Sequence, residues 1–142
     1  MQFTKAEEYG IFGVLYLADQ PADRITPLSE ISETQGVPEK FLAKIFQSLS
    51  KSGLVRSHRG VKGGFSLGRP ADQISIREIV EDIQGPYLIS KCLHTDDVCY
   101  RKECPIKLLL GKAQDALIDV FGKHTVADLL AWQKEIAVGG RR

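Results

Sequence analysis

Apolar residues recur at three- and four-residue steps along several stretches of the chain, and most of these stretches begin at residues that commonly cap helices. Thr4 and Glu7 have the spacing of a capping box, which predicts the start of a first helix. Thr26 followed by Pro27 has the pattern of a cap with proline at the first helical position. We expect a short second helix from this point to about Gly36.

A third helix is predicted from about Pro38 to Ser52, with its lysines on the side opposite its apolar residues. Two short strand patterns follow at residues 54–58 and 64–67, separated by the basic, glycine-rich sequence RGVKGG. A helix-turn-helix followed by such a hairpin predicts a winged helix, a fold class that is mainly α with a small β-wing. The expected buried face of the third helix is Phe41, Leu42, Ile45, Phe46 and Leu49.

A fourth helix is predicted from the capping box of Ser75 and Glu78, and it ends near Gly85. No period is visible from residue 86 to residue 104. A long helix is then expected to start at Pro105, and its apolar stripe exceeds what a small winged helix can cover. We therefore expect this helix to pair with a second copy in a homodimer. The stripe is Ile106, Leu109, Leu110, Ala113, Leu117, Val120 and Phe121.

A last helix is predicted where Thr125 and Asp128 have capping spacing. The expected organisation is a winged helix-turn-helix DNA-binding domain (1–85), a cluster-binding loop (86–104), a dimerisation helix with a C-terminal helix (105–137) and a disordered tail (138–142).

The distribution of charge indicates a nucleic-acid partner, although the formal net charge of the chain is only +1. The segment from Lys40 to Ala71 contains seven basic residues and no acidic ones, whereas solvated surfaces usually mix the two signs. We expect the third helix to enter the major groove of double-stranded DNA and the hairpin to contact phosphates or the minor groove. The expected DNA contacts are Lys40, Lys44, Gln47 and Ser48 on the helix and Arg56, Arg59 and Lys62 on the wing.

The start of the chain lacks the basic flank and cleavage site of a signal peptide, and no apolar run approaches the roughly 18 residues of a membrane span. We therefore expect a cytoplasmic protein without a membrane partner. Because thiols stay reduced in that compartment, clustered cysteines indicate metal binding or redox sensing more than a structural disulfide. No nucleophile–base pair and no second cofactor motif is visible, so neither an enzymatic activity nor a small-molecule substrate is expected.

The three cysteines of the chain, Cys92, Cys99 and Cys104, all lie within the aperiodic segment. Lysine and arginine flank them, and Pro105 places Cys104 at the start of a helix, where the helix dipole favours an anion. These features favour thiolate ligands for an iron–sulfur cluster. A zinc ion and a metal-free thiol sensor remain open from the residues alone.

These residues resemble the Rrf family of bacterial winged-helix regulators, in particular its iron–sulfur cluster-binding members. The resemblance covers nearly the whole chain and is carried by MQFTKAEEYG, RGVKGGFSLGRP, ISIREIVEDIQG, the cysteine triplet and TVADLLAW. It implies a homodimer on a partly palindromic operator and a [2Fe-2S] or [4Fe-4S] cluster held by the three cysteines. It also implies a fourth ligand from an acidic residue in the first helix of the partner subunit, and the matching position is Glu8.

Two departures from the family pattern concern the ligands. The cysteines are spaced C-x6-C-x4-C, whereas the well-known cluster binders are nearer C-x5-C-x5-C. The position at which some relatives have a histidine ligand is Lys107, which is no ordinary ligand while it is protonated. Besides Glu8, the other candidates for the fourth ligand are His94, Asp96, Asp97 and Glu103.

The sequence as a whole predicts a DNA-binding transcriptional regulator, acting as a repressor, whose operator affinity depends on an iron–sulfur cluster that senses redox state, nitric oxide or iron. One alternative is a cluster-free winged-helix regulator that responds to a metabolite, to a partner protein or to thiol oxidation. Another is an electron-transfer protein or redox enzyme built on the cluster.

Overall fold

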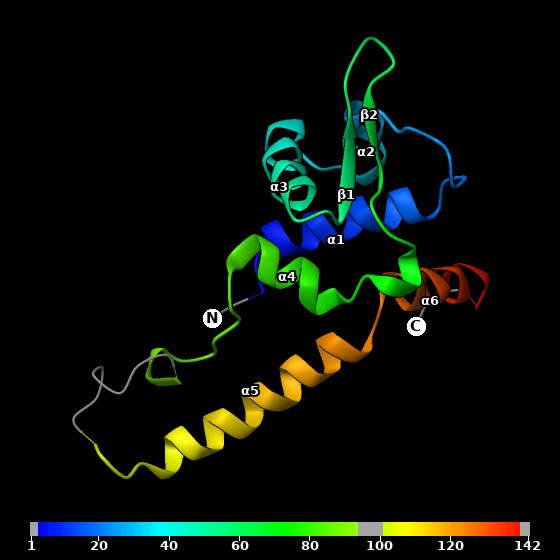
Figure 1. The fold of residues 1–142 in the computed structure, drawn as a ribbon. Coiled ribbons are helices and arrows are strands. Elements are labelled where there is room, and N and C mark those ends of the chain that lie inside the picture. The colour runs from blue at the N-terminus through cyan, green and yellow to red at the C-terminus, as the bar shows by residue number, and fades with distance from the viewer. Residues whose placement is uncertain (1–2, 94–100, 140–142) are drawn as a thin grey trace.

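The order of elements along the chain is that of a winged helix followed by two further helices (Figure 1). The computed structural model describes residues 3–93 and 101–139. Mainly helical with a two-stranded antiparallel sheet, it confirms the predicted fold class. The elements are α1 (Lys5–Ala18), α2 (Leu28–Gln35), α3 (Glu39–Lys51), β1 (Val55–His58), β2 (Gly64–Leu67), η1 (Ala71–Gln73), α4 (Ile76–Gln84), η2 (Lys91–Leu93), α5 (Pro105–Lys123) and α6 (Val126–Gly139).

The capping boxes predicted from the sequence are present at the starts of their helices. At α4, the backbone N–H of Glu78 donates to Ser75 Oγ at 3.1 Å, and the backbone N–H of Ser75 donates to Glu78 Oε2 at 2.9 Å. At α6, Thr125 and Asp128 make the same reciprocal pair of bonds at 2.9 Å and 3.2 Å. Each box satisfies backbone donors that a helix start leaves without partners.

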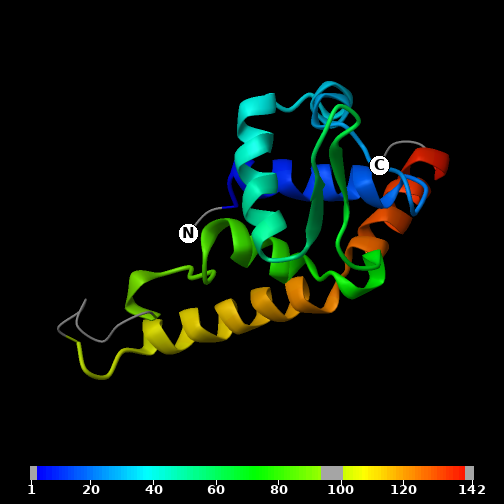
Figure 2. The same cartoon turned by 45° about the horizontal axis from the view of Figure 1, so that its top comes forward.

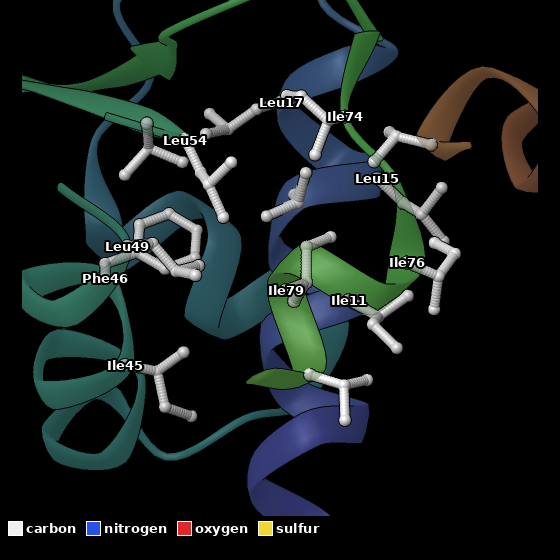
Figure 3. Close-up of a cluster of buried hydrophobic side chains, with 14 of the residues drawn as sticks. Ile11, Leu15, Leu17, Ile45, Phe46, Leu49, Leu54, Ile74, Ile76 and Ile79 are labelled. Atoms are coloured by element: carbon white, nitrogen blue, oxygen red, sulfur yellow. The ribbon is translucent and has the colours of Figure 1, made fainter. Parts of the chain in front are cut away.

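The core forms where α1 lies against α3 and α4, and Figure 3 shows their buried apolar side chains turned toward one another. At Gly13, α1 lies against α3 so closely that an added Cβ would lie 2.6 Å from Cε1 of Phe46. Gly10, one turn earlier, lies against Ile45 and Ile83 in the same way. Because α1 is in direct contact with α3, a displacement of one helix is transmitted to the other.

Phe41 corrects the predicted buried face of α3. Leu42, Phe46 and Leu49 are fully buried and Ile45 nearly so, but the side chain of Phe41 is 60% exposed. The apolar stripe is narrower than the periodicity indicated, because Phe41 lies about 100° around the helix from Leu42, at the edge of the side that faces the core.

Thr26 also corrects the sequence interpretation, because it forms an isolated β-bridge to β2 and is not a helix cap. Its backbone exchanges two hydrogen bonds with Phe65 of β2, at 2.9 Å and 2.8 Å. Pro27 is the N-cap of α2. Thr26 lies so close to Gly64 that an added Cβ there would overlap its carbonyl group. The glycine at position 64 is therefore required by the packing of the chain itself, whatever the wing contacts.

The apolar stripe of α5 divides between two surroundings. Leu117 and Phe121 pack on the core, and the Phe121 ring lies 5.9 Å from that of Tyr87, centroid to centroid. The other side of α5 is exposed, with Leu109 65% and Val120 51% accessible. The N-terminal half of α5 extends away from the winged helix, as Figure 1 shows.

The C-terminal helix α6 returns to the winged helix. The backbone N–H of Val126 donates to Ile74 O at 2.9 Å, and Lys134 forms an ion pair of 3.5 Å with Asp19, the C-cap of α1. Residues 138 and 139, which were expected in a disordered tail, belong to this helix, which ends at Gly139. Residues 140–142 lie outside the described part of the chain.

Candidate nucleic-acid interface and thiol segment

A groove of about 460 Å³ lies between α3 and the wing. Figure 2 shows these two elements side by side, on the side of the molecule away from α5. The groove is open and polar, and its described lining contains cationic and neutral side chains but no acidic one. The lining residues are Ala43, Lys44, Gln47, Ser50, Lys51, Ser57, Arg59 and Phe65.

The structure brings three of the predicted DNA contacts together in this groove: Lys44 and Gln47 from α3 and Arg59 from the wing. They meet because the hairpin folds back alongside α3, where Ser57 of β1 also faces the groove. A groove lined by cations and hydrogen-bonding groups attracts the phosphates of a duplex and offers donors to base edges.

The other predicted contacts are placed differently. Lys40 on α3 and Lys62 in the hairpin turn are exposed. Arg56 is also exposed, but strand alternation puts it on the face of β1 opposite Ser57. Ser48 does not face the groove, because its hydroxyl donates to Asp82 Oδ2 of α4 at 3.0 Å. The geometry therefore gives Ser48 a role in joining α3 to α4.

Two features of the hairpin fix the conformation of the wing. The side chain of His58 lies 2.8 Å from Ser66 Oγ across the two strands. Gly60 in the turn has a φ of +112°, a backbone conformation that side chains with a Cβ rarely adopt. These two features hold Arg59, which lies between them, at the edge of the groove.

Two of the three cysteines lie in the described part of the chain, at the two ends of the thiol segment. Cys92 is in η2 and Cys104 is the N-cap of α5, and both are half-buried. Cys99 lies outside the described residues. The Sγ of Cys92 is 3.1 Å from Ser90 Oγ, within hydrogen-bonding range for sulfur. The exposed cations Lys91, Arg101 and Lys102 flank the two thiols.

The segment before Cys92 is attached to the first half of α5. The backbone N–H of Ile89 donates to Gln114 Oε1 at 2.9 Å, and Leu93 lies beside Gly111. These contacts hold Cys92 along the same helix that Cys104 caps. The thiol segment is therefore anchored on both sides by α5, which is what a site that spans the segment requires.

Glu8, the predicted fourth ligand, lies on the first turns of α1 and is half-buried. Its Oε2 pairs with Lys5 Nζ at 3.2 Å. Glu7 beside it is fully buried: its Oε2 accepts from the backbone N–H of Thr4 at 2.6 Å and from the Thr4 hydroxyl, while Oε1 has no partner among the described residues. The capping box thus fixes the turn that carries Glu8.

The remaining ligand candidates are not placed at a site. His94, Asp96 and Asp97 lie outside the described residues, and Glu103 is exposed. Among residues 3–93 and 101–139, no group of three or more histidine, cysteine or acidic side chains is arranged to hold a metal ion. Three thiols in one segment nevertheless form a donor set suited to an iron–sulfur cluster, since thiolates are its usual ligands.

Within one chain the start of α1 is remote from the thiols. Phe3, just before α1, packs on Phe121, while Cys104 caps the opposite end of α5. Cys104 and Phe121 are 17 positions apart in the chain, which corresponds to about 25 Å of helix. Glu8 is five positions beyond Phe3, so it lies near the end of α5 that the thiols do not occupy.

Two exposed apolar residues of the basic face escaped the sequence interpretation: Phe41 on α3 and Val61 at the tip of the wing, which is fully exposed. Periodicity assigned Phe41 to the core. Its position directly after Lys40 and one turn before Lys44 was the signal that it borders the charged side.

The family of the chain follows from comparison with known proteins. Residues 3–132 match the Rrf2 family, described as iron-dependent transcriptional regulators. The chain belongs to the Rrf2 family. It is therefore a DNA-binding transcriptional regulator and not an enzyme. Rrf2 regulators commonly dimerise.

Solved structures agree in fold over nearly the whole chain. CymR of B. subtilis, the global cysteine regulator, is 26% identical, with a TM-score of 0.81 over 93% of this chain and 98% of that one. IscR of T. potens is 24% identical, with a TM-score of 0.77 over 95% and 90%. An oxidised form of Staphylococcus aureus CymR is 27% identical, with a TM-score of 0.74 over 92% and 96%. Among the described residues, no helix is both long and apolar enough to cross a membrane.

Proposed function

We propose that this Rrf2-family regulator is a homodimer whose affinity for a partly palindromic operator depends on an iron–sulfur cluster. The ligands are Cys92, Cys99 and Cys104 of one subunit and Glu8 of the partner subunit. The observation that carries the proposal is the placement of the thiols and the start of α1 at opposite ends of α5.

The dimer rests on the exposed side of α5. Its apolar residues follow three- and four-residue steps in alternation, which is the spacing of a coiled-coil seam. None of α5 is fully buried within one chain, and an uncovered stripe of this length favours a partner helix. A second copy supplies an identical stripe, so the pairing is self-complementary. The stripe is Ile106, Leu109, Ala113, Ala116 and Val120.

An antiparallel pairing of the two α5 helices completes the site. It lays the Cys104 end of one helix beside the Phe121 end of the other, where Phe3 fixes the start of α1. Glu8 of the partner subunit then comes to the thiol segment, whereas Glu8 of the same chain stays about 25 Å of helix away. The ion pair between Glu8 and Lys5 is on the surface and offers little resistance to the exchange of partners.

The residues present suit the cluster. Three thiolates and a carboxylate complete four positions, and the nearby Lys91, Arg101 and Lys102 offset the negative charge of the ligands. When bound, the cluster supplies a centre whose oxidation, nitrosylation or loss reports on the state of the cell. The protein contributes the anchoring of the thiol segment on α5 and the orientation of Glu8 by the capping box at Thr4.

The site reaches the DNA-binding surface through α1. The same helix carries Glu8 at one end and contacts Phe46 of α3 at Gly13. Fixing or releasing the first turn of α1 therefore shifts α3 and changes the spacing of the two recognition helices. Such couplings are typically about 1–3 kcal/mol, or roughly 5–150-fold in affinity.

The test is to purify the protein without oxygen and to measure iron and sulfide together with binding to its own promoter. We expect a coloured dimer with one cluster per subunit, and an operator affinity that changes when a chelator removes the iron. Serine at positions 92, 99 and 104 should abolish the iron content and reproduce the affinity of the iron-free protein. Colourless protein whose affinity is indifferent to these substitutions would refute the proposal.

A cluster-free thiol regulator is the second candidate, and the likeness to CymR, which is a cysteine regulator solved in an oxidised form, favours it. The half-buried thiols of Cys92 and Cys104 would then be the sensing groups. The same purification separates the two functions. This candidate requires metal-free protein whose DNA affinity changes with peroxide and is restored by a reductant.

A further inference from the structure

Phe41 is an aromatic residue on the exposed side of the recognition helix. Its side chain is 60% accessible, whereas the apolar residues that follow it, Leu42, Ile45 and Phe46, are between 0% and 8% accessible. It occupies the first turn of α3, which begins at Glu39. An isolated exposed apolar residue needs no explanation on most surfaces. This one directly follows Lys40, and Lys44 lies one turn further along the same side of α3, so it borders the basic side of the helix.

The helical row that contains Phe41 shows where its ring points. At 3.6 residues per turn, Phe41, Lys44 and Ser48 share one side of α3. Of these three residues, Ser48 is nearest the C-terminal end of α3, and its hydroxyl contacts α4 through the hydrogen bond to Asp82. Phe41 lies about 10 Å nearer the N-terminal end of the helix. Figure 2 shows that this end of α3 is directed away from α5.

The N-terminal residues of a recognition helix are the ones that contact base edges in the major groove. A phenyl ring there gains nothing from phosphates or from the polar edges of bases. The apolar group that the major groove presents is the C5 methyl of thymine, and phenylalanine is among the side chains that contact it.

We infer that Phe41 reads a thymine through its C5 methyl in each half of the operator. This inference rests on the proposed function, since it requires that α3 enter the major groove of a specific site. It adds a sequence preference that charge alone does not give, because Lys40 and Lys44 attract any duplex.

The test is to replace each thymine of the operator in turn by deoxyuridine, which removes only the methyl group, and to measure the dissociation constant. At one thymine in each half-site, this replacement should weaken the affinity of the parent about fourfold. That ratio corresponds to the free energy gained when one apolar carbon is removed from water. Phe41→Ala, which removes the ring from both subunits, should lose about sixteenfold on the unmodified operator and show no further loss at that thymine. Phe41→Leu should retain part of the deoxyuridine penalty.

The control is Phe12→Ala, since Phe12 is also exposed, at 42%, but lies on α1 in a hollow lined by residues of α1 and α6 and none of α3. It should keep the affinity and the penalty of the parent, and circular dichroism should show that all three variants remain folded. A parent without any deoxyuridine penalty, or a penalty that persists in both Phe41→Ala and Phe41→Leu, would overturn the inference while leaving operator binding intact. A parent that binds all sequences alike would instead overturn operator recognition itself, and the inference with it.

Discussion

The ring of Phe3 packs edge to face on the ring of Phe121, with their centroids 6.3 Å apart. This contact fixes the start of α1 to the C-terminal part of α5, whereas Cys104 caps the other end of that helix. A single chain therefore separates Glu8 from its own thiols. The separation is the reason to expect a site that two subunits share.

Mixed dimers test this directly. One subunit carries serine at all three cysteine positions and keeps Glu8; the other keeps its cysteines and carries Glu8→Ala. If Glu8 acts across the interface, the mixed dimer has one complete set of ligands and should hold one stable cluster. The dimer of Glu8→Ala alone has none and should lose iron faster. Iron and sulfide content, with the visible spectrum over time in air, measure the difference.

The matched control is Lys5→Ala, which breaks the ion pair of Glu8 without removing the carboxylate. It should leave the stability of the cluster unchanged. A mixed dimer as labile as the Glu8→Ala dimer would place the fourth ligand within one chain, or on another residue.

Two neighbouring leucines of α5 test the dimer. Leu108 and Leu109 are both 65% exposed, but only Leu109 lies on the proposed seam. Leu109→Lys should yield a monomer by light scattering, because an unpaired buried charge costs about 3–5 kcal/mol and weakens association ~100-fold or more. Leu108→Lys, on the polar side of the helix, should remain dimeric. If both variants dimerise equally, the seam is elsewhere.

The sequence predicted most elements of the fold because their signals are local. Ser75 with Glu78 and Thr125 with Asp128 form caps that depend on residues three positions apart, and both are present. Thr26 was misread because its partner, Phe65, is distant in the chain. A threonine before a proline suits a cap and a β-bridge equally, and only the fold decides between them.

The candidate site was predictable in part. Clustered charge indicated Lys44 and Arg59, and the polar side of the predicted helix indicated Gln47; the fold brings all three to one groove. Ser48 faces α4 instead, since a helical period defines sides of a helix but not what covers each side. The proposed fourth ligand is not encoded locally, because the proposal makes it depend on how two chains pair.

Glu30 on α2 joins the helix-turn-helix to α1 and makes the stability depend on pH. Its carboxylate accepts hydrogen bonds from Arg24 at 2.7 Å and from Tyr16 at 2.6 Å, which lower its pKa from 4.5 to about 2. The stabilisation is therefore complete above pH 4.5 and is lost as the pH falls toward 2. Glu30→Gln should lower the melting temperature at neutral pH. The difference in melting temperature between this variant and the parent should shrink as the pH falls from 4.5 to about 2.

Differential scanning fluorimetry across this range is the measurement, with Glu33→Gln, an exposed carboxylate of the same helix, as the control. The control should follow the parent at every pH. A deficit of Glu30→Gln that does not change with acidification would mean that the charge of the carboxylate does not stabilise the fold.

Arg59 tests the groove as the DNA-binding surface. It lies opposite Lys44 at the edge of the wing, where a duplex seated on α3 brings a phosphate to the guanidinium. Arg59→Ala should weaken operator and non-specific binding together. It should also reduce the slope of log affinity against log salt by about 1 per subunit, since one phosphate contact fewer releases one counterion fewer.

Arg77→Ala is the matched control, because Arg77 lies on α4 and pairs with Glu81 at 2.9 Å. It should keep the salt slope of the parent. Equal slopes for the parent and Arg59→Ala, measured by fluorescence anisotropy over a range of salt concentrations, would remove the wing from the interface and leave α3 to bind DNA alone.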